Sequence, residues 1–350
     1  MLTIAVTGLN AHDNPGPGVA VIRSLRDAFA NLTIIGLSYE SLEPAIYMDG
    51  LVDKTYQIPY PTAGTSALSE RLQHIHEQDK LDVIIPNFDS ELFNFIKIAP
   101  WLASIGIKTF LPSHEQLASR DKVNLLQFGK KHGFMVPEHR QINNLNELQK
   151  AGEDLGYPLV VKGKYYEAYV TYTPDVAQKS FHQLSAKWGL PVIAQKFIKG
   201  AEINIAGLGD GEGNVISIVP MRKMYITDKG KAWAGITIED NALIELATKF
   251  IKNTKWRGGF ELEIMRDADD KLYIMEINPR FPAWIYLATG AGQNQPGTLV
   301  KMAIGEKVTP FIKYEVGKMF IRYSWDQLVD IADFQQFSAF GEIDRSKINA

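Results

Sequence analysis

The chain has 350 residues, a formal net charge of −3 and no cysteine. A chain of this length is expected to form two or three domains. The lack of cysteine excludes disulfides, thiolate zinc sites and cysteine nucleophiles, and it is compatible with the reducing cytoplasm, where we expect the protein to act. The small net charge gives no reason to expect nucleic acid or a membrane as a partner, and we expect neither.

The N-terminal part of the sequence predicts a parallel α/β domain. Its first segment, MLTIAVTGLN, has no basic stretch before a short apolar run, so we expect a strand there and not a signal peptide. Short apolar runs then alternate with helical patterns, which is typical of a doubly wound, Rossmann-like sheet with strands buried on both faces. The predicted strands are 2–8, 32–38, 81–86 and 107–112.

The loop after the first strand, within AVTGLNAHDNPGPGVAVIRSL (5–25), resembles a nucleotide-binding turn. A dinucleotide turn needs Gly-x-Gly-x-x-Gly spacing, whereas seven residues separate Gly8 from Gly16 here. We therefore predict no nucleotide at this loop. Backbone N–H groups at a helix N-terminus suit an anion, so Gly16 and Gly18 could hold an anion, with a purely structural turn as the alternative.

The pattern changes after a helical stretch at 113–133, for which Ser113 is the predicted N-cap and Gly133 the predicted C-cap. Strand-and-turn segments interrupted by helices follow, which is typical of an α+β unit with antiparallel sheets. The clearest helix is predicted at 240–253, behind Asp240 as its cap. The C-terminal FIRYSWDQLVDIADF predicts a last strand and helix packed on the body.

The segment FELEIMRDADDKLYIMEINPR (260–280) predicts a β-hairpin with its turn centred between residues 269 and 270. That centre places Glu263 opposite Glu276, and Asn278 shares the face of Glu276. Like charges that face each other destabilise a sheet unless a cation lies between them. Two carboxylates and an amide oxygen suit Mg²⁺ bound together with phosphates. The alternative is a solvated face of alternating charge.

Several other charged residues are candidates for anion or nucleotide contacts. Arg280 follows the hairpin and could hold an anion beside the metal. Lys122 lies in the helical stretch, and Lys162 ends an apolar strand, where a buried ammonium needs an anionic partner. The strand end at 195–198 offers backbone groups to an adenine edge, and Glu202 could reach a ribose hydroxyl. The alternative for each lysine is an ordinary solvent-exposed side chain, and the alternative for the segment at 195–202 is an ordinary strand end.

Taken in order, these residues resemble the ATP-grasp superfamily, and most of all its carboxylate–amine ligases, carbamoyl-phosphate synthetases and biotin carboxylases. The resemblance covers about residues 1–310, and its most specific part is the Glu…Glu-x-Asn-Pro-Arg block. It implies a pre-ATP-grasp, Rossmann-like domain at 1–112 and an α+β ATP-grasp domain at 113–310. The latter would contain a lid at about 120–195 and a catalytic subdomain at about 196–310, followed by a C-terminal segment at 311–350.

The resemblance also implies a role for each matching residue, and an ATP and Mg²⁺ requirement, with Mn²⁺ as an alternative ion. The phosphates of ATP would be held by Lys122 and Lys162, the adenine by main-chain atoms of Lys196 and Ile198 beside Gln195 and Phe197, and the ribose by Glu202. The metal would be held by Glu263, Glu276 and Asn278. Lys162 and Arg280 would be the catalytic residues, with Arg280 steadying a carboxylate or the acyl phosphate that it becomes.

The function implied is an ADP-forming ligase that activates a carboxylate as an acyl phosphate for attack by an amine, on an amino acid or peptide. Its partners would be small-molecule or peptide carboxylates and amines, and a second copy of the chain in a homodimer. Two alternatives stay open: a bicarbonate-activating, carboxylase-type enzyme and a non-catalytic nucleotide-binding regulatory protein. The basic residues Arg222, Lys223 and Lys231 are predicted to contact substrate or form a second anion clamp, with a solvated basic loop as the alternative. The resemblance also implies that an anion at Gly16 and Gly18 would be the acceptor substrate.

Two further features bear on the site. After Lys162 the sequence KGKYYEAYVTYTPDV contains one glycine, so the glycine-rich phosphate loop of many family members is missing, and Lys164 or the tyrosines Tyr165 and Tyr166 would have to replace it. Asp89, Ser90 and Glu91 follow a predicted strand at the edge where open α/β sheets bind ligands. They either contact substrate or cap the next helix.

Overall fold

A computed structural model describes residues 1–11, 14–164, 167–228 and 230–346. The chain divides into two compact units, each assembled from separate stretches. The first unit comprises Met1–His114, Asn204–Glu261 and Asn278–Ala350, and the second comprises Glu115–Ile203 and Leu262–Ile277. The chain passes between the units within three strands, β9 (Gly200–Asp210), β12 (Arg257–Asp267) and β13 (Leu272–Asn278).

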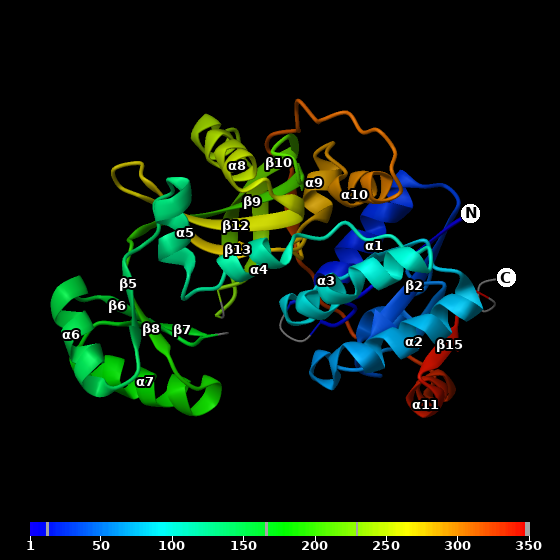
Figure 1. Cartoon of the computed structure of the whole chain (residues 1–350), viewed down its shortest axis with the longest axis horizontal. Coiled ribbons are helices and arrows are strands. Elements are labelled where there is room, and N and C mark those ends of the chain that lie inside the picture. Colours follow the sequence, from blue (N-terminus) through cyan, green and yellow to red (C-terminus); the bar gives the residue numbers. More distant parts are fainter. Residues whose placement is uncertain (12–13, 165–166, 229, 347–350) are drawn as a thin grey trace. The chain divides into compact units, whose positions relative to one another are not determined.

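The first unit contains a five-stranded sheet in the order β15-β3-β2-β1-β4 (Figure 1). Within it β1 pairs in parallel with β2 and β4, and β2 with β3, whereas β15 is antiparallel to β3. The side chains of Ile4, Ala5 and Val6 are all buried, as expected for a strand covered on both faces. The predicted parallel α/β unit is confirmed. The strands are β1 (Leu2–Val6), β2 (Leu32–Ser38), β3 (Lys54–Gln57), β4 (Val83–Ile85) and β15 (Glu342–Asp344).

The first helices of this unit follow strands of the five-stranded sheet along the chain. The first helix begins at Pro17, where the fixed φ of proline is already helical and its missing N–H costs nothing. It buries Val21, Ile22 and Leu25. The helices are α1 (Pro17–Ala28), α2 (Gly64–Asp79), α3 (Asp89–Ser104), α8 (Asn241–Thr254), α9 (Tyr286–Gly290), α10 (Gln295–Ala303) and α11 (Ile331–Phe340), with short 3₁₀ turns η1 (Pro44–Tyr47) and η2 (Pro61–Ala63).

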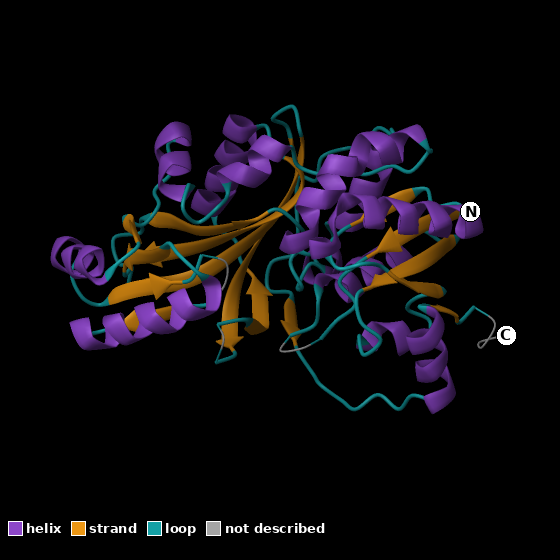
Figure 2. Cartoon of the chain, turned by 60° about the horizontal axis from the view of Figure 1, so that its bottom comes forward, coloured by secondary structure: helices purple, strands orange, loops and turns teal. Residues whose placement is uncertain are grey.

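The strand predicted at 107–112 is wrong, because the structure has only an isolated parallel bridge between Val83 and Lys108. Both main-chain groups of Lys108 are bonded there, but the Leu111 carbonyl accepts a bond of 2.7 Å from the Arg257 guanidinium in place of a strand partner. The predicted C-terminal strand and helix are present as β14 (Met319–Ile321) and α11. The chain then adds β15 to the edge of the five-stranded sheet (Figure 2).

A second sheet has the order β13-β12-β9-β10-β11-β14. Its strands β10 (Val215–Ile226) and β11 (Ala232–Thr237) form an antiparallel hairpin, and β11 pairs with β14 in the same sense. Helix α8 packs on β10 and begins as predicted, because the Asp240 side chain accepts the N–H of Leu243 at 3.2 Å. The predicted antiparallel sheets of the α+β part are thus confirmed.

The second unit has its own four-stranded sheet in the order β5-β8-β6-β7, in which β8 pairs antiparallel with β5 and β6, and β6 pairs antiparallel with β7. Helices α6 and α7 pack against each other and against this sheet, and they bury its apolar side chains (Figure 1). The elements are β5 (His139–Ile142), α6 (Leu145–Leu155), β6 (Leu159–Lys162), β7 (Ala168–Thr171), α7 (Pro174–Trp188) and β8 (Val192–Lys196).

The helical stretch predicted at 113–133 is interrupted. It consists of α4 (His114–Ser119) and α5 (Leu125–His132), joined by a turn in which the N–H of Asn124 donates to the carbonyl of Asp121. Gly133 ends α5 in the left-handed region at φ 74°, as predicted. Lys122 therefore lies in a turn and not inside a helix.

Candidate functional site

Two lysines and three carboxylates of the second unit form a charged group that we call the lysine–carboxylate cluster. The Lys122 ammonium lies 3.6 Å from a carboxylate oxygen of Glu276, and both side chains are largely shielded, at 19% and 30% exposed. Burial lowers the pKa of Lys162, and the neighbouring Lys122 lowers it further. The carboxylates of Glu276, Glu263 and Glu202 oppose that shift. These five side chains therefore interact electrostatically within a single unit.

The cluster is assembled from segments far apart in the sequence. Lys122 comes from the turn between α4 and α5, Lys162 from the end of β6, and Glu202 from the start of β9. Glu263 and Glu276 come from β12 and β13. Since the pKa of Lys162 stays lowered despite three carboxylates, its ammonium is undersolvated and would be stabilised by an added anion. The arrangement suits the binding of an anion and a cation together.

The hairpin that carries Glu263 and Glu276 has a different turn from the predicted one. The N–H of Asp267 donates to the carbonyl of Lys271 at 3.1 Å, so the turn is centred on Asp269, with Asp270 in the left-handed region at φ 60°. A three-residue loop of this kind introduces a bulge, so register cannot be counted from a symmetric turn. That the two glutamates lie directly opposite each other stays a prediction.

The described residues include the side chains predicted to bind a metal. No group of three His, Cys, Asp or Glu side chains there forms a ready-made metal site. Asn278 donates through its amide nitrogen to Glu261 at 3.1 Å, so its carbonyl oxygen is the atom with which a hard cation could be bound. The chemistry of Glu263, Glu276 and Asn278 fits Mg²⁺, and this metal site stays a prediction.

The segment predicted to hold adenine lies at the end of β8. Gln195 is buried, and its side-chain oxygen has no hydrogen-bond partner among the described residues. The N–H of Lys196 donates to the carbonyl of Glu138 at 2.8 Å, so it is not free to contact a base. A base would have to use the Lys196 carbonyl and groups of the half-buried Phe197 and Ile198 beyond the strand. A buried, unpaired amide oxygen is costly unless a ligand completes it.

The first unit contains a buried carboxylate that the sequence reasoning missed. Glu261 is 6% exposed and accepts hydrogen bonds from Asn204 Nδ2 at 2.7 Å, Trp284 Nε1 at 2.7 Å and Asn278 Nδ2 at 3.1 Å. Its position two residues before Glu263 on β12 was the available signal, because alternate residues of a strand share a face. The three donors keep this charge stable inside the unit.

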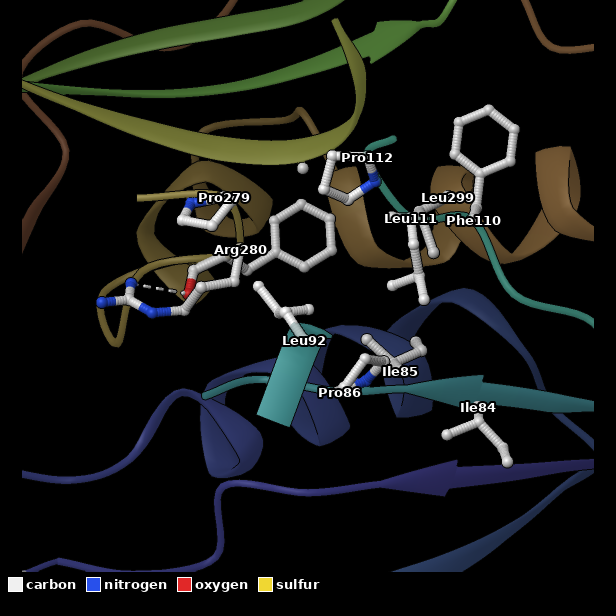
Figure 3. A pocket seen from close by; sticks show the side chains of 12 residues that line it. Ile84, Ile85, Pro86, Leu92, Phe110, Leu111, Pro112, Pro279, Arg280 and Leu299 are labelled. Atoms are coloured by element: carbon white, nitrogen blue, oxygen red, sulfur yellow. Dashed lines mark hydrogen bonds between the residues drawn. The ribbon is translucent and has the colours of Figure 1, made fainter. Parts of the chain in front are cut away.

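Arg280, the other predicted catalytic residue, is held by two carboxylates of the first unit. Its Nε donates to Asp89 at 3.0 Å, and its guanidinium lies 3.6 Å from Glu261. A further bond of 3.3 Å runs from Nη1 to the carbonyl of Phe281 (Figure 3). The pocket that Arg280 borders in Figure 3 is apolar and has a volume of only about 20 Å³, room for a single water rather than a substrate.

The glycine loop after β1 is tightly packed. A Cβ on Gly18 would lie 2.3 Å from the Thr7 carbonyl oxygen, and one on Gly16 would lie 2.4 Å from Asn10 Oδ1. The N–H groups of Gly16 and Gly18 donate to the carbonyls of Asn10 at 2.6 Å and Gly8 at 3.0 Å. These contacts favour the structural turn, and a substrate role for the two glycines stays a prediction without support from their amides.

The remaining predicted contacts fall on separate elements. Arg222 and Lys223 are neighbours on β10, so their side chains leave opposite faces of the strand. Lys223 donates to the carbonyl of Gly230 at 3.2 Å, whereas Arg222 and Lys231 are exposed. Glu91 caps α3 by accepting the N–H of Phe88 at 2.9 Å. Tyr165 and Tyr166 lie outside the described residues.

The fold is similar to that of a solved carboxylase domain. The biotin carboxylase domain of the Hydrogenobacter thermophilus 2-oxoglutarate carboxylase, a dimer solved with MgADP, ADP and bicarbonate, matches with a TM-score of 0.68 and 16% identity. The match covers 89% of this chain and 72% of that one. The chain therefore has the ATP-grasp fold, and the resemblance expected from the sequence is confirmed at the level of the fold.

Comparisons of sequence agree. Residues 190–321 match the family described as ATP-grasp in the biosynthetic pathway with Ter operon. The carbamoyl phosphate synthase large chain of Clostridium acetobutylicum is 24% identical over 227 residues, which are 60% of this chain and 21% of that protein. The D-alanine–D-alanine ligase of Bordetella petrii is 26% identical over 176 residues, 46% of this chain and 54% of that protein. The chain thus spans about a fifth to about a half of these relatives.

Among the described helices, none is both long enough and apolar enough to cross a membrane.

Proposed function

We propose that the protein is an ATP-dependent, ADP-forming ligase that joins a carboxylate to an amine, on an amino acid or peptide. The observation that carries the proposal is the lysine–carboxylate cluster, in which a buried ammonium of lowered pKa lies among carboxylates suited to a divalent cation. The ATP-grasp fold and the similarity to D-alanine–D-alanine ligase support the same assignment.

The chemistry begins with a carboxylate, which is a poor electrophile because the group that leaves would be oxide. Transfer of the terminal phosphoryl group of ATP to a carboxylate oxygen forms an acyl phosphate and releases ADP. The amine nitrogen then attacks the acyl carbon, the C–O bond to phosphate breaks, and inorganic phosphate and a proton leave. The protein contributes position and charge neutralisation, because the transfer spreads negative charge over oxygens.

Each residue has a task in this scheme. Lys122 and Lys162 bind the phosphates, and the added negative charge stabilises the Lys162 ammonium, whose pKa stays lowered despite the neighbouring carboxylates. Mg²⁺, held by Glu263, Glu276 and Asn278, supplies charge neutralisation to the phosphates when it is bound. Adenine meets the segment at 195–198, where the unpaired oxygen of Gln195 would accept a hydrogen bond from its amino group, and Glu202 binds the ribose.

Arg280 orients the carboxylate or the acyl phosphate. Its guanidinium is fixed by Asp89 and Glu261, and such fixation lowers the entropy lost when it binds an anion. In this scheme Glu261 acts on Arg280 and on Asn278 together, because it accepts a hydrogen bond from Asn278 and faces the guanidinium. Glu261 is thus a positioning residue shared by the metal ligand and the anion-binding arginine.

The test is ADP release from the purified chain, screened over pooled carboxylates and amines with mass detection of the product. The proposal expects ADP release that depends on one acid and one amine. Glu276→Gln should reduce that release by roughly 100-fold, as for the loss of a metal-binding residue, whereas the exposed Glu153→Gln should retain it. Release that depends on bicarbonate without an acid would favour the carboxylase alternative. Nucleotide binding without turnover over all pools would favour a regulatory protein.

A further inference from the structure

The first unit contains a pocket of about 190 Å³ at the carboxyl edge of its parallel sheet. Its lining includes Asn10, Tyr39, Glu40, Glu43, Tyr60 and Phe88. These residues lie in the segments that follow β1, β2, β3 and β4, at the edge where open α/β sheets bind ligands. Among the described residues, the lining contains two carboxylates and three aromatic rings but no Lys, Arg or His. An anion is therefore a poor occupant, and a cation a good one.

The aromatic wall is rigid. The rings of Tyr39 and Tyr60 stack with centroids 5.6 Å apart, and Phe88 lies 6.0 Å from Tyr39. The Tyr39 hydroxyl donates to the buried carboxylate of Glu91. That carboxylate also accepts bonds from the Thr7 hydroxyl at 2.5 Å and from the N–H groups of Asn87 and Phe88 at 2.7 and 2.9 Å. Glu91 thus holds the ring of Tyr39 in place from behind.

The pocket also contains unpaired acceptors. Glu43 is 3% exposed, and its Oε1 accepts the N–H of Tyr39 at 2.9 Å. Its Oε2 and the Oδ1 of Asn10 are both buried, and neither has a hydrogen-bond partner among the described residues. The Ser38 hydroxyl donates to the Glu40 carbonyl at 2.6 Å and also lies close enough to the Glu43 carboxylate to oppose the rise in its pKa. Two buried acceptors that lack donors need a ligand that brings N–H groups.

A second carboxylate, that of Glu40, is held in position at the rim of the pocket. The Tyr60 hydroxyl donates to Glu40 at 2.8 Å, which holds this exposed carboxylate beside the aromatic wall. Burial raises the pKa of Glu43 to about 7, so a positive charge placed in the pocket would draw the proton from Glu43 and gain a second anionic partner. A ring face, a carboxylate and an N–H acceptor together are the features that recognise ammonium and guanidinium groups.

We propose that this pocket binds the cationic head group, an ammonium or guanidinium, of the amine substrate. The proposal rests on the proposed ligase function, because only that function makes the bound molecule a substrate. The amine that reacts must be neutral, so the pocket would hold a second, charged group of the same molecule. Ser90 also lines the pocket, and its neighbour Asp89 bonds the Arg280 guanidinium, so the pocket adjoins the residue assigned to the carboxylate.

Isothermal titration of the purified chain with matched probes tests this without ATP. The probes are n-butylguanidinium against n-butylurea and n-butylammonium against n-butanol, pairs that differ in the charged group and carry no other charge. We expect at least one cationic probe to bind tenfold or more tightly than its neutral counterpart. Glu43→Gln should weaken that binding at least tenfold, and Glu40→Gln and Tyr60→Leu several-fold. The matched control Glu70→Gln removes an exposed carboxylate of the same unit that does not line the pocket, and it should leave binding unchanged.

Equal affinity for charged and neutral probes, or no binding of either cationic probe, would overturn the proposal. Full binding by both Glu43→Gln and Glu40→Gln would do the same. If Glu43→Gln does not fold, Glu40→Gln and Tyr60→Leu decide the question, because both side chains are exposed, Tyr60 at 50%. The two proposals fail separately: cation binding without ADP release contradicts the ligase, and ligation with unchanged activity in all three pocket variants contradicts the pocket.

Discussion

The Lys122 ammonium lies 3.6 Å from the Glu276 carboxylate, although 153 residues separate them in the sequence. The same carboxylate is the largest opposing influence on the lowered pKa of Lys162. One glutamate thus interacts electrostatically with both of the lysines that we propose bind the phosphates of ATP. Loss of Glu276 is therefore expected to change the electrostatic environment of both lysines even where no metal is present.

Glu276→Gln is expected to lower the pKa of Lys162 further. The substitution removes the strongest carboxylate that favours the charged ammonium, whereas burial and Lys122 continue to disfavour it. The measurement is a titration of the Lys162 side chain by ¹³C NMR of labelled lysine, without nucleotide or metal. Glu153→Gln is the control. An unchanged or higher pKa in Glu276→Gln would contradict the cluster as described.

Glu261→Leu is expected to destabilise the protein by about 3–5 kcal/mol, because it leaves the Arg280 guanidinium and the Trp284 and Asn204 donors without their shared acceptor. Urea denaturation measures the free energy of unfolding. Glu261→Gln keeps an acceptor oxygen and should cost less. Glu70→Gln, an exposed change in the same unit, should stay within about 0.5 kcal/mol of wild type. If Glu261→Leu loses less stability than Glu70→Gln, the buried carboxylate is not required for the stability of the protein.

Gly18→Ala is expected to cost about 1–3 kcal/mol or more, because the new Cβ would lie 2.3 Å from the Thr7 carbonyl oxygen. The matched change Gly290→Ala in α9 meets nothing within 4 Å and should be neutral or stabilise by up to about 1 kcal/mol. Thermal unfolding of the two variants gives the comparison. Equal stability of the two would contradict the close approach of the loop to α1.

The pKa of Glu43 produces a dependence of stability on pH. The carboxyl pKa is raised from 4.5 to about 7 in the folded protein, so its contribution is present below pH 4.5 and is lost as the pH rises through 7. We expect wild type to lose on the order of 3 kcal/mol relative to Glu43→Gln between pH 4.5 and pH 8. Unfolding in urea at a series of pH values measures the difference. A constant difference between the two proteins would show that Glu43 ionises normally.

Much of the fold is predictable from local pattern. The strand and helix alternation of the N-terminal part, the Asp240 cap and the left-handed Gly133 depend on spacing and on backbone preferences within a few residues. The failures have tertiary causes. The stretch at 113–133 breaks into two helices around a turn at Asp121, and the expected strand at 107–112 shrinks to one bridge because Arg257, far along the chain, takes the Leu111 carbonyl.

The candidate site likewise has features that the sequence indicates and features that only the structure reveals. The order of the charged residues along the chain was enough to indicate the ATP-grasp fold, because residue type and spacing are local properties. The roles of Lys122, Lys162 and Glu276 stay predictions. The sequence did not reveal that Glu261 is a buried acceptor for three side chains, or that the amides of Gly16 and Gly18 are already bonded.

The sequence by itself indicated many of the elements and the chemical groups that they carry. Only the tertiary structure decided which of those groups are desolvated and which find partners, as for the lowered pKa of Lys162, the raised pKa of Glu43 and the bonded carboxylate of Glu261. Desolvation and hydrogen bonding depend on atoms that meet across long stretches of chain, and they set the free energy of a charge far more than its neighbours in sequence do.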